Sequence, residues 1–343
     1  MAIRYEIRAA LRSDHAALLE LARFLDSVNL PDDPAAVREV VDASEDAFTE
    51  AVGDTRKRQY VFILRDLEED RAVGTSMILG QLGRRDAPYI YFDVLAEEKY
   101  SNTLDKHFVH QVLSIGYSYA GPTEIGGLVM HPDYRRSPEK LGMLISYVRF
   151  LFIAMNRSAF RDQVLAELLP PLEPDGTSHL WEAIGRRFTG MTYREADRLS
   201  KRNKEFVKGL FPDGDIYASL LAPEAQAVIG KVGAQTRGVE KLLRRIGFRY
   251  VNRVDPFDGG PHFMAPTDEI DLVARSVALR AEVGAVEKTS GRVLVACDYD
   301  EAPWFRALAA RASVGDESVT IDAETAAHLG VGARDALWTL PLD

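Results

Sequence analysis

Alternating apolar and polar residues mark several strands in the first part of the chain. Residues 3–9 read as a strand, and Ser13-Asp14 then reads as a helix N-cap before HAALLELARFL, which is apolar at helical spacing. A second amphipathic stretch covers roughly residues 35–52. The segment YVFILRDLEEDRAVGTSMILGQLG predicts a β-hairpin with a charged turn, and YIYFDVLAE predicts a further strand. This pattern predicts a strand, two helices and an antiparallel meander.

A strand, a short loop with two arginines and a helix are expected between Glu124 and Met155. EIGGLVMHP is an apolar strand with adjacent glycines. Ser137 is a good N-cap residue and Pro138 suits the first helical position, so the helix is expected from Pro138 to about Met155. VLAEL then predicts a strand, and the segments up to residue 265 read mainly as helices.

The pattern changes after about residue 265, where short strands surround one short helix. Asp322 is placed to cap that helix and Gly330 to end it. The tail is therefore expected to form a small β-rich module.

Composition and charge narrow the classes of function. The formal net charge of the 343 residues is −10, which argues against nucleic acid as the main partner. Cys297 is the only cysteine, so no disulfide forms within the chain, which fits a reducing compartment. The first residues lack the features of a signal peptide, and the apolar stretch FLFIAM is far shorter than a membrane span. We expect a cytoplasmic protein that does not enter a membrane.

The strand–loop–helix segment carries the most informative chemistry. Backbone N–H groups at a helix N-terminus bind anions, and Arg135 and Arg136 stand just before this helix. Gly126 and Gly127 would let a ligand approach the strand closely. Acetyltransferases of the GNAT type hold the diphosphate of coenzyme A in a unit of this order. The alternative is that the glycines mark only a β-bulge, and the loop RRSPEKLG keeps only Gly142 of the usual glycine pattern.

The wider sequence resembles the arginine N-succinyltransferase family. The segments that carry the resemblance, in chain order, are YVFILRD, EIGGLVMHPDYRR, LISYVRFLFIA, VLAEL, SHLWEAIGRRFTGMTYREAD, DIYASLLAPEAQAVIGKVGAQT and RIGFRYVNRVDPFDGGP. The last of these is the most similar to the family. Their order and spacing along the chain are hard to obtain by chance.

The resemblance implies an α+β fold: a GNAT-type mixed sheet flanked by helices, a second GNAT-like half and the C-terminal β-rich module. The expected domains are a GNAT-like acyltransferase region at residues 1–265 and the β-rich module at residues 266–343. The first contains a cofactor segment at residues 124–155 and an acceptor-side segment at residues 160–265. The resemblance also implies succinyl transfer from succinyl-CoA to the α-amine of L-arginine or ornithine, a step of arginine catabolism. The resemblance implies a succinyl-CoA contact at Leu128, and with the strand–loop–helix unit the full set of expected cofactor contacts is Leu128, Val129, Met130, Arg135, Arg136 and Gly142.

Three departures from the family pattern concern the site. Gly233, in KVGAQT, stands where the resemblance implies a histidine that donates a proton. His131 replaces a family aspartate, and LLPP follows Glu167 where the family has Met-Arg-Gly. These changes leave open which amine and which acyl group the protein uses.

The candidate general bases are Glu124, His131 and Glu167, because removing a proton from an amine needs a nearby carboxylate or imidazole. The alternatives are a solvated carboxylate at a strand end, a loop histidine and a core ion pair, respectively. Burial of Glu167 in an apolar strand would raise its pKa.

Other residues have competing interpretations. Asp255 and Asp258 are candidates for holding a cationic substrate, or for capping a turn. His107 and His110 lie three apart on an expected helix, but no further ligands of recognisable spacing complete a metal site, so no metal is expected. Trp181 and Tyr217 are expected in the core rather than stacked on a ligand.

Three functions remain in competition: the family reaction, acylation of a different amine, and a non-catalytic partner subunit of a two-chain acyltransferase. The expected partners are a small-molecule amine and an acyl-CoA, in a homo-oligomer or a heteromer with a related chain.

Overall fold

The computed structural model describes residues 3–24, 29–85, 87–200 and 203–342, and these form two compact units. The first unit combines three stretches of the chain: Met1–Gln81, Thr123–Asp162 and Thr267–Asp343. The second combines Leu82–Pro122 and Gln163–Pro266. The β-rich tail therefore groups with the N-terminal strands in space, while the proposed division at residue 265 stays a prediction.

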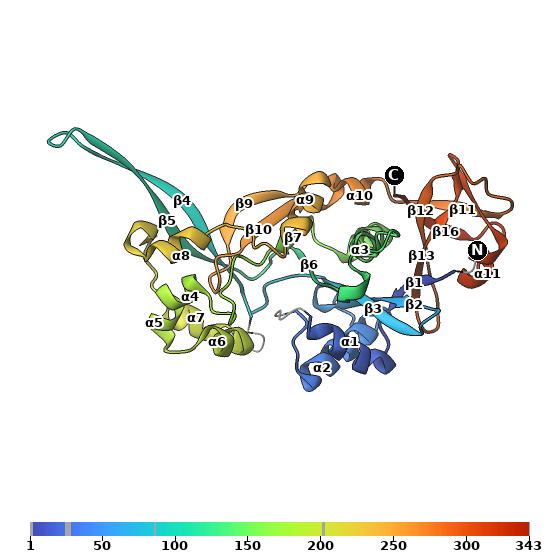
Figure 1. Cartoon of the computed structure of the whole chain (residues 1–343), viewed down its shortest axis with the longest axis horizontal. Coiled ribbons are helices and arrows are strands. Elements are labelled where there is room, and N and C mark those ends of the chain that lie inside the picture. Colours follow the sequence, from blue (N-terminus) through green and yellow to red (C-terminus); the bar gives the residue numbers. More distant parts are fainter. Residues whose placement is uncertain (1–2, 25–28, 86, 201–202, 343) are drawn as a thin grey trace. The chain divides into compact units, whose positions relative to one another are not determined.

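The first unit is built on a sheet with the strand order β14-β15-β11-β16-β12-β13-β1-β2-β3-β6 (Figure 1). In the described part of the chain, the neighbouring strands of this sheet pair antiparallel except β11 with β15, so the sheet is mixed, and the expected α+β class is confirmed. The strand bounds are β1 (Tyr5–Ala9), β2 (Gln59–Asp66), β3 (Arg71–Leu79), β6 (Thr123–Met130), β11 (Val277–Val283), β12 (Arg292–Asp298), β13 (Phe305–Arg311), β14 (Ser313–Val314), β15 (Ser318–Ile321) and β16 (Ala336–Pro341).

Helices cover both faces of this sheet around β2. α1 (His15–Ala22) and α2 (Pro34–Phe48) pack with Val61 and Ile63 on one face. α3 (Leu141–Met155) lies on the other face, where its Phe152 packs against Phe62 with ring centroids 5.2 Å apart. The alternation of neighbouring β2 residues between the two faces follows from strand geometry. The predicted β2–β3 hairpin is confirmed.

The entry to α1 differs from the prediction. Arg12–Asp14 form a 3-10 turn and α1 begins at His15, without a side-chain cap from Asp14. The Asp14 carboxylate instead accepts two hydrogen bonds from the Arg8 guanidinium, at 2.6 and 2.8 Å, and one from the Leu11 amide. A buried ion pair has displaced the expected cap.

The β-rich tail forms its own core around α11 (Ala323–Leu329). The Asp322 carboxylate accepts from the Thr325 amide at 2.7 Å and Gly330 closes the helix at φ +66°, so both predicted caps are confirmed. Cys297 is a free, buried thiol in this core. Helix α10 (Asp271–Ala274) precedes the tail.

The second unit contains an antiparallel sheet with the order β7-β10-β9-β4-β5-β8. The strand bounds are β7 (Gln163–Glu167), β10 (Pro261–Pro266), β9 (Arg249–Val254), β4 (Tyr89–Ser101), β5 (Lys106–Ser118) and β8 (Ile216–Tyr217). Its helices are α4 (His179–Ala183), α5 (Gly185–Thr189), α6 (Tyr193–Ser200), α7 (Glu205–Leu210), α8 (Pro223–Val228) and α9 (Arg237–Arg245). A second GNAT-like half stays a prediction.

Aromatic side chains hold the core of the second unit. Trp181 is fully buried and stacks on Phe257 with ring centroids 5.0 Å apart, so its predicted place in the core is confirmed. Tyr217 is half-buried, and its hydroxyl donates to Glu97 on β4.

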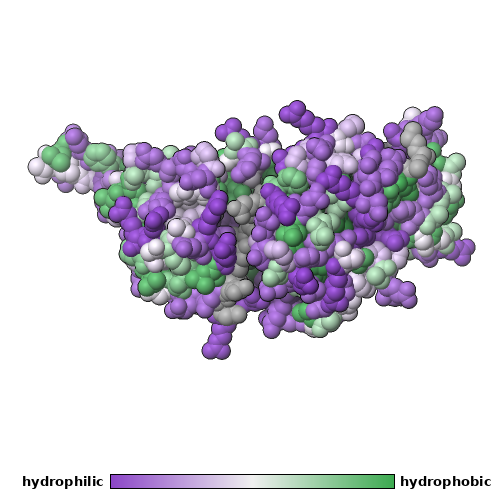
Figure 2. Space-filling view, turned by 60° about the horizontal axis from the view of Figure 1, so that its bottom comes forward, coloured by the Kyte–Doolittle hydropathy of each residue, from purple (hydrophilic) through white to green (hydrophobic). Residues whose placement is uncertain are grey.

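The β4–β5 hairpin extends beyond the other strands of the second unit (Figure 1). His107 and His110 lie on β5, not on a helix as predicted, and a spacing of three on a strand directs their side chains to opposite faces. His107 pairs with Glu98 and His110 contacts Ser219, so the two histidines form no common site. Exposed apolar side chains along this hairpin are visible as green spheres in Figure 2.

No helix in the described part of the chain combines the length and the apolar character that crossing a bilayer requires.

Candidate functional site

The strand of the cofactor segment, β6, carries a bulge at its two glycines. Its register with β3 shifts between Thr75 and Met77, opposite the Gly126–Val129 stretch. Gly127 has φ +54°, a left-handed conformation that glycine adopts without strain, and a Cβ at Gly126 would lie 2.1 Å from the Asn29 side-chain nitrogen. The glycines therefore do mark a bulge, a feature that is common beside active sites.

The residues around this bulge differ in exposure. Val129 is buried in the core beneath α1 and α2, while Leu128 and Met130 on either side are partly exposed. This alternation is what a β-strand imposes. Backbone and side-chain groups at Leu128 and Met130 are thus the accessible part of the predicted cofactor strand.

Helix α3 starts at Leu141, three residues later than predicted. The Ser137 hydroxyl donates to the Glu139 carboxylate instead of capping a helix, and Lys140 occupies the N-cap position with φ +56° and no side-chain cap. Met143 and Leu144 make the first bonds of the helix, both to the Lys140 carbonyl. The amides of Leu141 and Gly142 come before these bonds, where a helix offers N–H groups to an anion.

The two arginines of the loop are exposed, and Arg135 donates from Nε to the Met130 carbonyl at 3.2 Å. Gly142 lies in the first turn of α3, and a Cβ there would meet only Met130 Cγ at 3.5 Å, an ordinary contact. The predicted cofactor residues therefore come together along one segment, β6 to the first turn of α3, and their role in binding stays a prediction.

Two of the predicted bases have partners inside the first unit. Glu124 is buried and accepts from the Asn29 amide at 2.9 Å. The Arg71 guanidinium, which is always protonated, lies 2.8 Å from His131 Nε2. Arg71 therefore donates to Nε2, so the lone pair that a general base needs is already engaged. The roles of Glu124 and His131 as general bases stay predictions.

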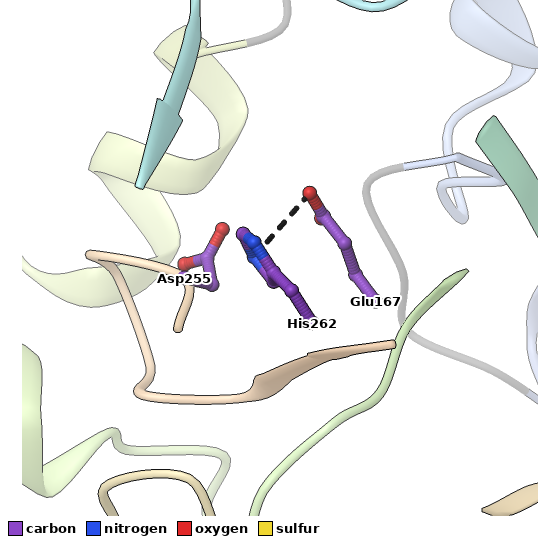
Figure 3. A group of neighbouring side chains, drawn as sticks. All are labelled: Glu167, Asp255 and His262. Carbon is purple, nitrogen blue, oxygen red and sulfur yellow. Dashed lines mark ion pairs between the residues drawn. The ribbon is translucent and has the colours of Figure 1, made fainter. Parts of the chain in front are cut away.

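The third predicted base, Glu167, belongs to a cluster in the second unit. Glu167 ends β7 and pairs directly with His262 on β10, so their side chains share a face of the sheet. Glu167 Oε1 and His262 Nε2 are 3.5 Å apart, and a carboxylate oxygen of Glu167, a carboxylate oxygen of Asp255 and a ring nitrogen of His262 all lie within 4.8 Å of one another. Figure 3 shows the two carboxylates on either side of the imidazole. We call these three residues the acid–imidazole cluster.

His262 is the buried centre of this cluster and was not among the predicted site residues. Its Nδ1 lies 2.7 Å from the Tyr89 hydroxyl, whereas Nε2 has no hydrogen-bond partner among the described residues. Burial, with Arg253 and Lys204 nearby, lowers the pKa of His262 to about 3. The ring is therefore neutral at physiological pH, and its Nε2 lies 3.5 Å from Glu167 Oε1 without forming a hydrogen bond to it.

Asp255 and Asp258 form the turn that precedes β10. Asp255 Oδ1 accepts from the amides of Phe257 and Asp258, and Asp258 Oδ1 accepts from Gly260, so both aspartates do cap the turn. Burial raises the pKa of Asp255. Burial and the neighbouring Asp255 raise the pKa of Asp258 well above its usual range. The folded protein therefore keeps a proton on this pair at a pH where the unfolded chain has lost it.

Asp258→Asn is expected to change how stability depends on pH. Because the folded pKa is raised, the folded state loses stability as pH rises from the ordinary carboxyl range toward the raised pKa. Asparagine can still accept from the Gly260 amide but does not titrate. Thermal unfolding of both proteins between pH 4 and pH 8 should show the variant gaining stability relative to the parent as pH rises. If the two proteins change stability in parallel over this pH range, the raised pKa of Asp258 is contradicted.

Gly233 is tightly packed against the chain that leaves β7. Its amide donates to the Leu169 carbonyl at 2.8 Å, and a Cβ would lie 2.6 Å from the Pro170 carbonyl oxygen. A side chain therefore fits only if the backbone shifts. That this position corresponds to a family histidine stays a prediction.

Gly233→His is expected to destabilise the protein by about 1–3 kcal/mol, the usual cost of overpacking, without raising any transferase activity. Gly238→His is the matched control, because a Cβ at Gly238 meets nothing within 4 Å. Thermal unfolding and turnover of both variants test this. A Gly233→His protein that is as stable as the parent and more active would contradict this prediction. It would show that a histidine fits at this position and increases transferase activity.

The α+β fold, with a strand–loop–helix unit opening on a helix N-terminus, is the arrangement expected of a GNAT-type acyltransferase. Residues 5–272 match the family described as arginine N-succinyltransferase beta subunit. Arginine N-succinyltransferase of Yersinia pestis (strain Pestoides F) is 34% identical over 297 residues, covering 84% of this chain and 83% of that protein. The chain belongs to the arginine N-succinyltransferase family, whose members are N-acyltransferases.

Two further comparisons come from Pseudomonas aeruginosa. A protein named arginine N-succinyltransferase subunit beta is 32% identical over 339 residues and covers 98% of both chains. The solved structure of arginine/ornithine succinyltransferase subunit AI matches with a TM-score of 0.85 and 27% identity, over 100% of both chains. The likeness therefore extends over the whole chain, including the β-rich tail.

Proposed function

We propose that the protein transfers a succinyl group from succinyl-CoA to the α-amine of L-arginine or ornithine. The observation that carries the proposal is membership of the arginine N-succinyltransferase family, with relatives and a solved structure of that name matching nearly the full length. Two features support it: exposed Arg135 and Arg136 precede the N-terminus of α3 in the first unit, and two carboxylates lie beside an imidazole in the second unit.

We assign the donor to the segment from β6 to α3 in the first unit. The diphosphate of the acyl-CoA binds the amides of Leu141 and Gly142, with the guanidinium groups of Arg135 and Arg136 paired to its oxygens. Leu128, Val129 and Met130 bind the pantetheine arm. A backbone N–H near Leu128 and Val129 stabilises the oxyanion of the tetrahedral intermediate.

We assign the acceptor to the acid–imidazole cluster in the second unit. The ammonium form of the amine loses a proton, the free amine attacks the thioester carbonyl, and the carbon–sulfur bond breaks as the amide forms. A second proton leaves the nitrogen and the thiolate is protonated, so one proton is released for each CoA. Glu167 is our candidate for the first proton, because it is the most exposed member of the cluster.

Mixing the full-length protein with succinyl-CoA and L-arginine tests the proposal. We expect release of free CoA thiol and a product with the mass of N2-succinylarginine. A panel of acyl-CoAs and amines, including ornithine, then defines the specificity. The proposal fails if no combination releases CoA.

Two alternatives share this fold. The first is acylation of a different amine, favoured by the LLPP segment after Glu167, and it predicts turnover with another member of the panel. The second is a non-catalytic partner subunit, favoured by the tight packing that leaves Gly233 no room for a side chain. It predicts activity only after a second, related chain is added.

A cytoplasmic location and assembly into a homo-oligomer or heteromer also remain proposals. They rest on the lone cysteine and on the subunit names of the relatives.

A further inference from the structure

Three hydrogen-bond acceptors converge in the acid–imidazole cluster from three segments of the second unit. They are a carboxylate oxygen of Glu167 at the end of β7, a carboxylate oxygen of Asp255 in the turn after β9, and a ring nitrogen of His262 on β10 (Figure 3). His262 is completely buried, and its Nε2 has no hydrogen-bond partner in the described chain. A buried ring nitrogen of this kind carries a desolvation cost that a bound hydrogen-bonding group would remove.

We propose that this cluster binds a primary ammonium group, the charged α-amine of an acceptor amino acid. The inference rests on the proposed function and extends it by naming the group that is recognised and the residue, His262, that completes the site. An ammonium has three N–H donors and no acceptor, which matches three convergent acceptors and a net negative charge. Glu167, whose side chain is about one-third exposed, is the solvent-facing member and opens the site to the ligand.

The spacing of the acceptors admits both a small metal ion and an ammonium, so the charges around the cluster and the zinc probe below separate the two. Three acceptors that surround a tetrahedral nitrogen at about 2.9 Å lie about 4.7 Å from one another, whereas ligands of a tetrahedral zinc ion lie only about 3.3 Å apart. In the cluster, Glu167 Oε1 and His262 Nε2 are 3.5 Å apart, close to the zinc spacing, while the upper limit of 4.8 Å for the whole group also admits the wider ammonium spacing. A guanidinium, by contrast, is planar and pairs best with a single carboxylate in a two-pronged contact.

The tautomer of His262 is compatible with this role. The Tyr89 hydroxyl both donates and accepts, so it can accept from Nδ1–H and leave the Nε2 lone pair facing the ligand. The burial that raises the pKa of Tyr89 keeps its hydroxyl protonated, and the lowered pKa of His262 keeps the ring neutral. Lys204 and Arg253 add positive charge near the cluster. Their presence disfavours a divalent metal more than a singly charged ammonium.

Calorimetry on the full-length protein without acyl-CoA tests the proposal with three probes: L-arginine, Nα-acetyl-L-arginine and zinc chloride. We expect L-arginine to bind, and Nα-acetyl-L-arginine to bind at least tenfold more weakly because it lacks the α-ammonium. Glu167→Gln should weaken L-arginine about tenfold to a hundredfold, the usual range for a hydrogen bond to a charged group. Glu173→Gln, which alters an exposed Glu–His pair of the same unit, should have no effect.

His262 is tested by a pair of variants. His262→Gln keeps an acceptor oxygen and should retain part of the affinity, whereas His262→Leu should lose it. Thermal unfolding checks that each variant folds. If His262→Leu does not fold, Glu167→Gln and the acetylated probe still decide the question.

Three outcomes would overturn the inference. Equal binding of L-arginine and its Nα-acetyl form would place the recognition elsewhere on the amino acid. Zinc binding that excludes L-arginine and disappears in Glu167→Gln would make the cluster a metal site. Unchanged L-arginine affinity in Glu167→Gln would remove the cluster from recognition, even if turnover with succinyl-CoA is normal. Conversely, ammonium binding without turnover with any acyl-CoA would count against the proposed function alone.

Discussion

Gly142→Glu is expected to lower the affinity for succinyl-CoA by about a hundredfold while leaving the fold intact. The new carboxylate would stand in the first turn of α3, beside the amides that we assign to the diphosphate. Two charges about 5 Å apart near a protein surface repel by about 3 kcal/mol, which corresponds to roughly two orders of magnitude in affinity. Calorimetric titration with succinyl-CoA measures the change.

Gly142→Ala is the matched control for this variant. A Cβ at this position makes only an ordinary contact with Met130, and a glutamate in the first turn of a helix is favourable to the helix itself. Both variants should therefore unfold near the temperature of the parent, and Gly142→Ala should bind succinyl-CoA within a few-fold of the parent. Equal affinity for all three proteins would mean that the diphosphate does not bind at this helix end.

Glu167→Gln is expected to reduce kcat/KM for the acyl transfer by about 10²- to 10⁴-fold, the usual contribution of a general base. Glutamine keeps the size of the side chain and can still accept a hydrogen bond, but it cannot accept a proton at neutral pH. Steady-state kinetics across pH measure the effect. The acidic limb of the parent's pH profile should be absent from the residual activity of the variant.

Glu173→Gln serves again as the control, because its carboxylate pairs with His179 on the surface of the same unit. Its kinetics should match those of the parent. A Glu167→Gln enzyme with normal kcat/KM and a normal pH profile would transfer the role of base to another group. Glu124 and His131 would then be the next residues to test.

Helices and strands were predictable from the sequence where residues close together in the chain determine them. The β2–β3 hairpin and the caps of α11 follow from local alternation and from Asp322 and Gly330. The start of α3 was not predictable in this way. The Ser137 hydroxyl bonds a neighbouring side chain, and Lys140 adopts a left-handed conformation that sequence patterns assign to glycine or asparagine.

The β4–β5 hairpin shows a second reason why secondary structure was predicted wrongly. Residues in KHFVHQVLSIGYS do not alternate cleanly, because much of the hairpin is exposed on both faces and carries no core-facing pattern. A spacing of three between His107 and His110 then suggested a helix. The periodicity signal disappears where a strand has no buried side.

The acid–imidazole cluster was predictable only in part. Glu167 was a candidate base because it is a carboxylate in an apolar strand, and Asp255 was a candidate for holding a cationic substrate because it is a carboxylate in a turn. His262 was missed, since PHFMA resembles an ordinary core strand. Its role becomes visible only when β7 pairs with β10 in the register that sets His262 opposite Glu167, which no local pattern specifies.

A crystal structure of the protein with bound succinyl-CoA tests the donor assignment most directly. We predict diphosphate oxygens within hydrogen-bonding distance of the Leu141 and Gly142 amides, with Arg135 or Arg136 paired to the same group. A cofactor whose diphosphate lies away from the first turn of α3, with those amides facing water or protein, would contradict the assignment.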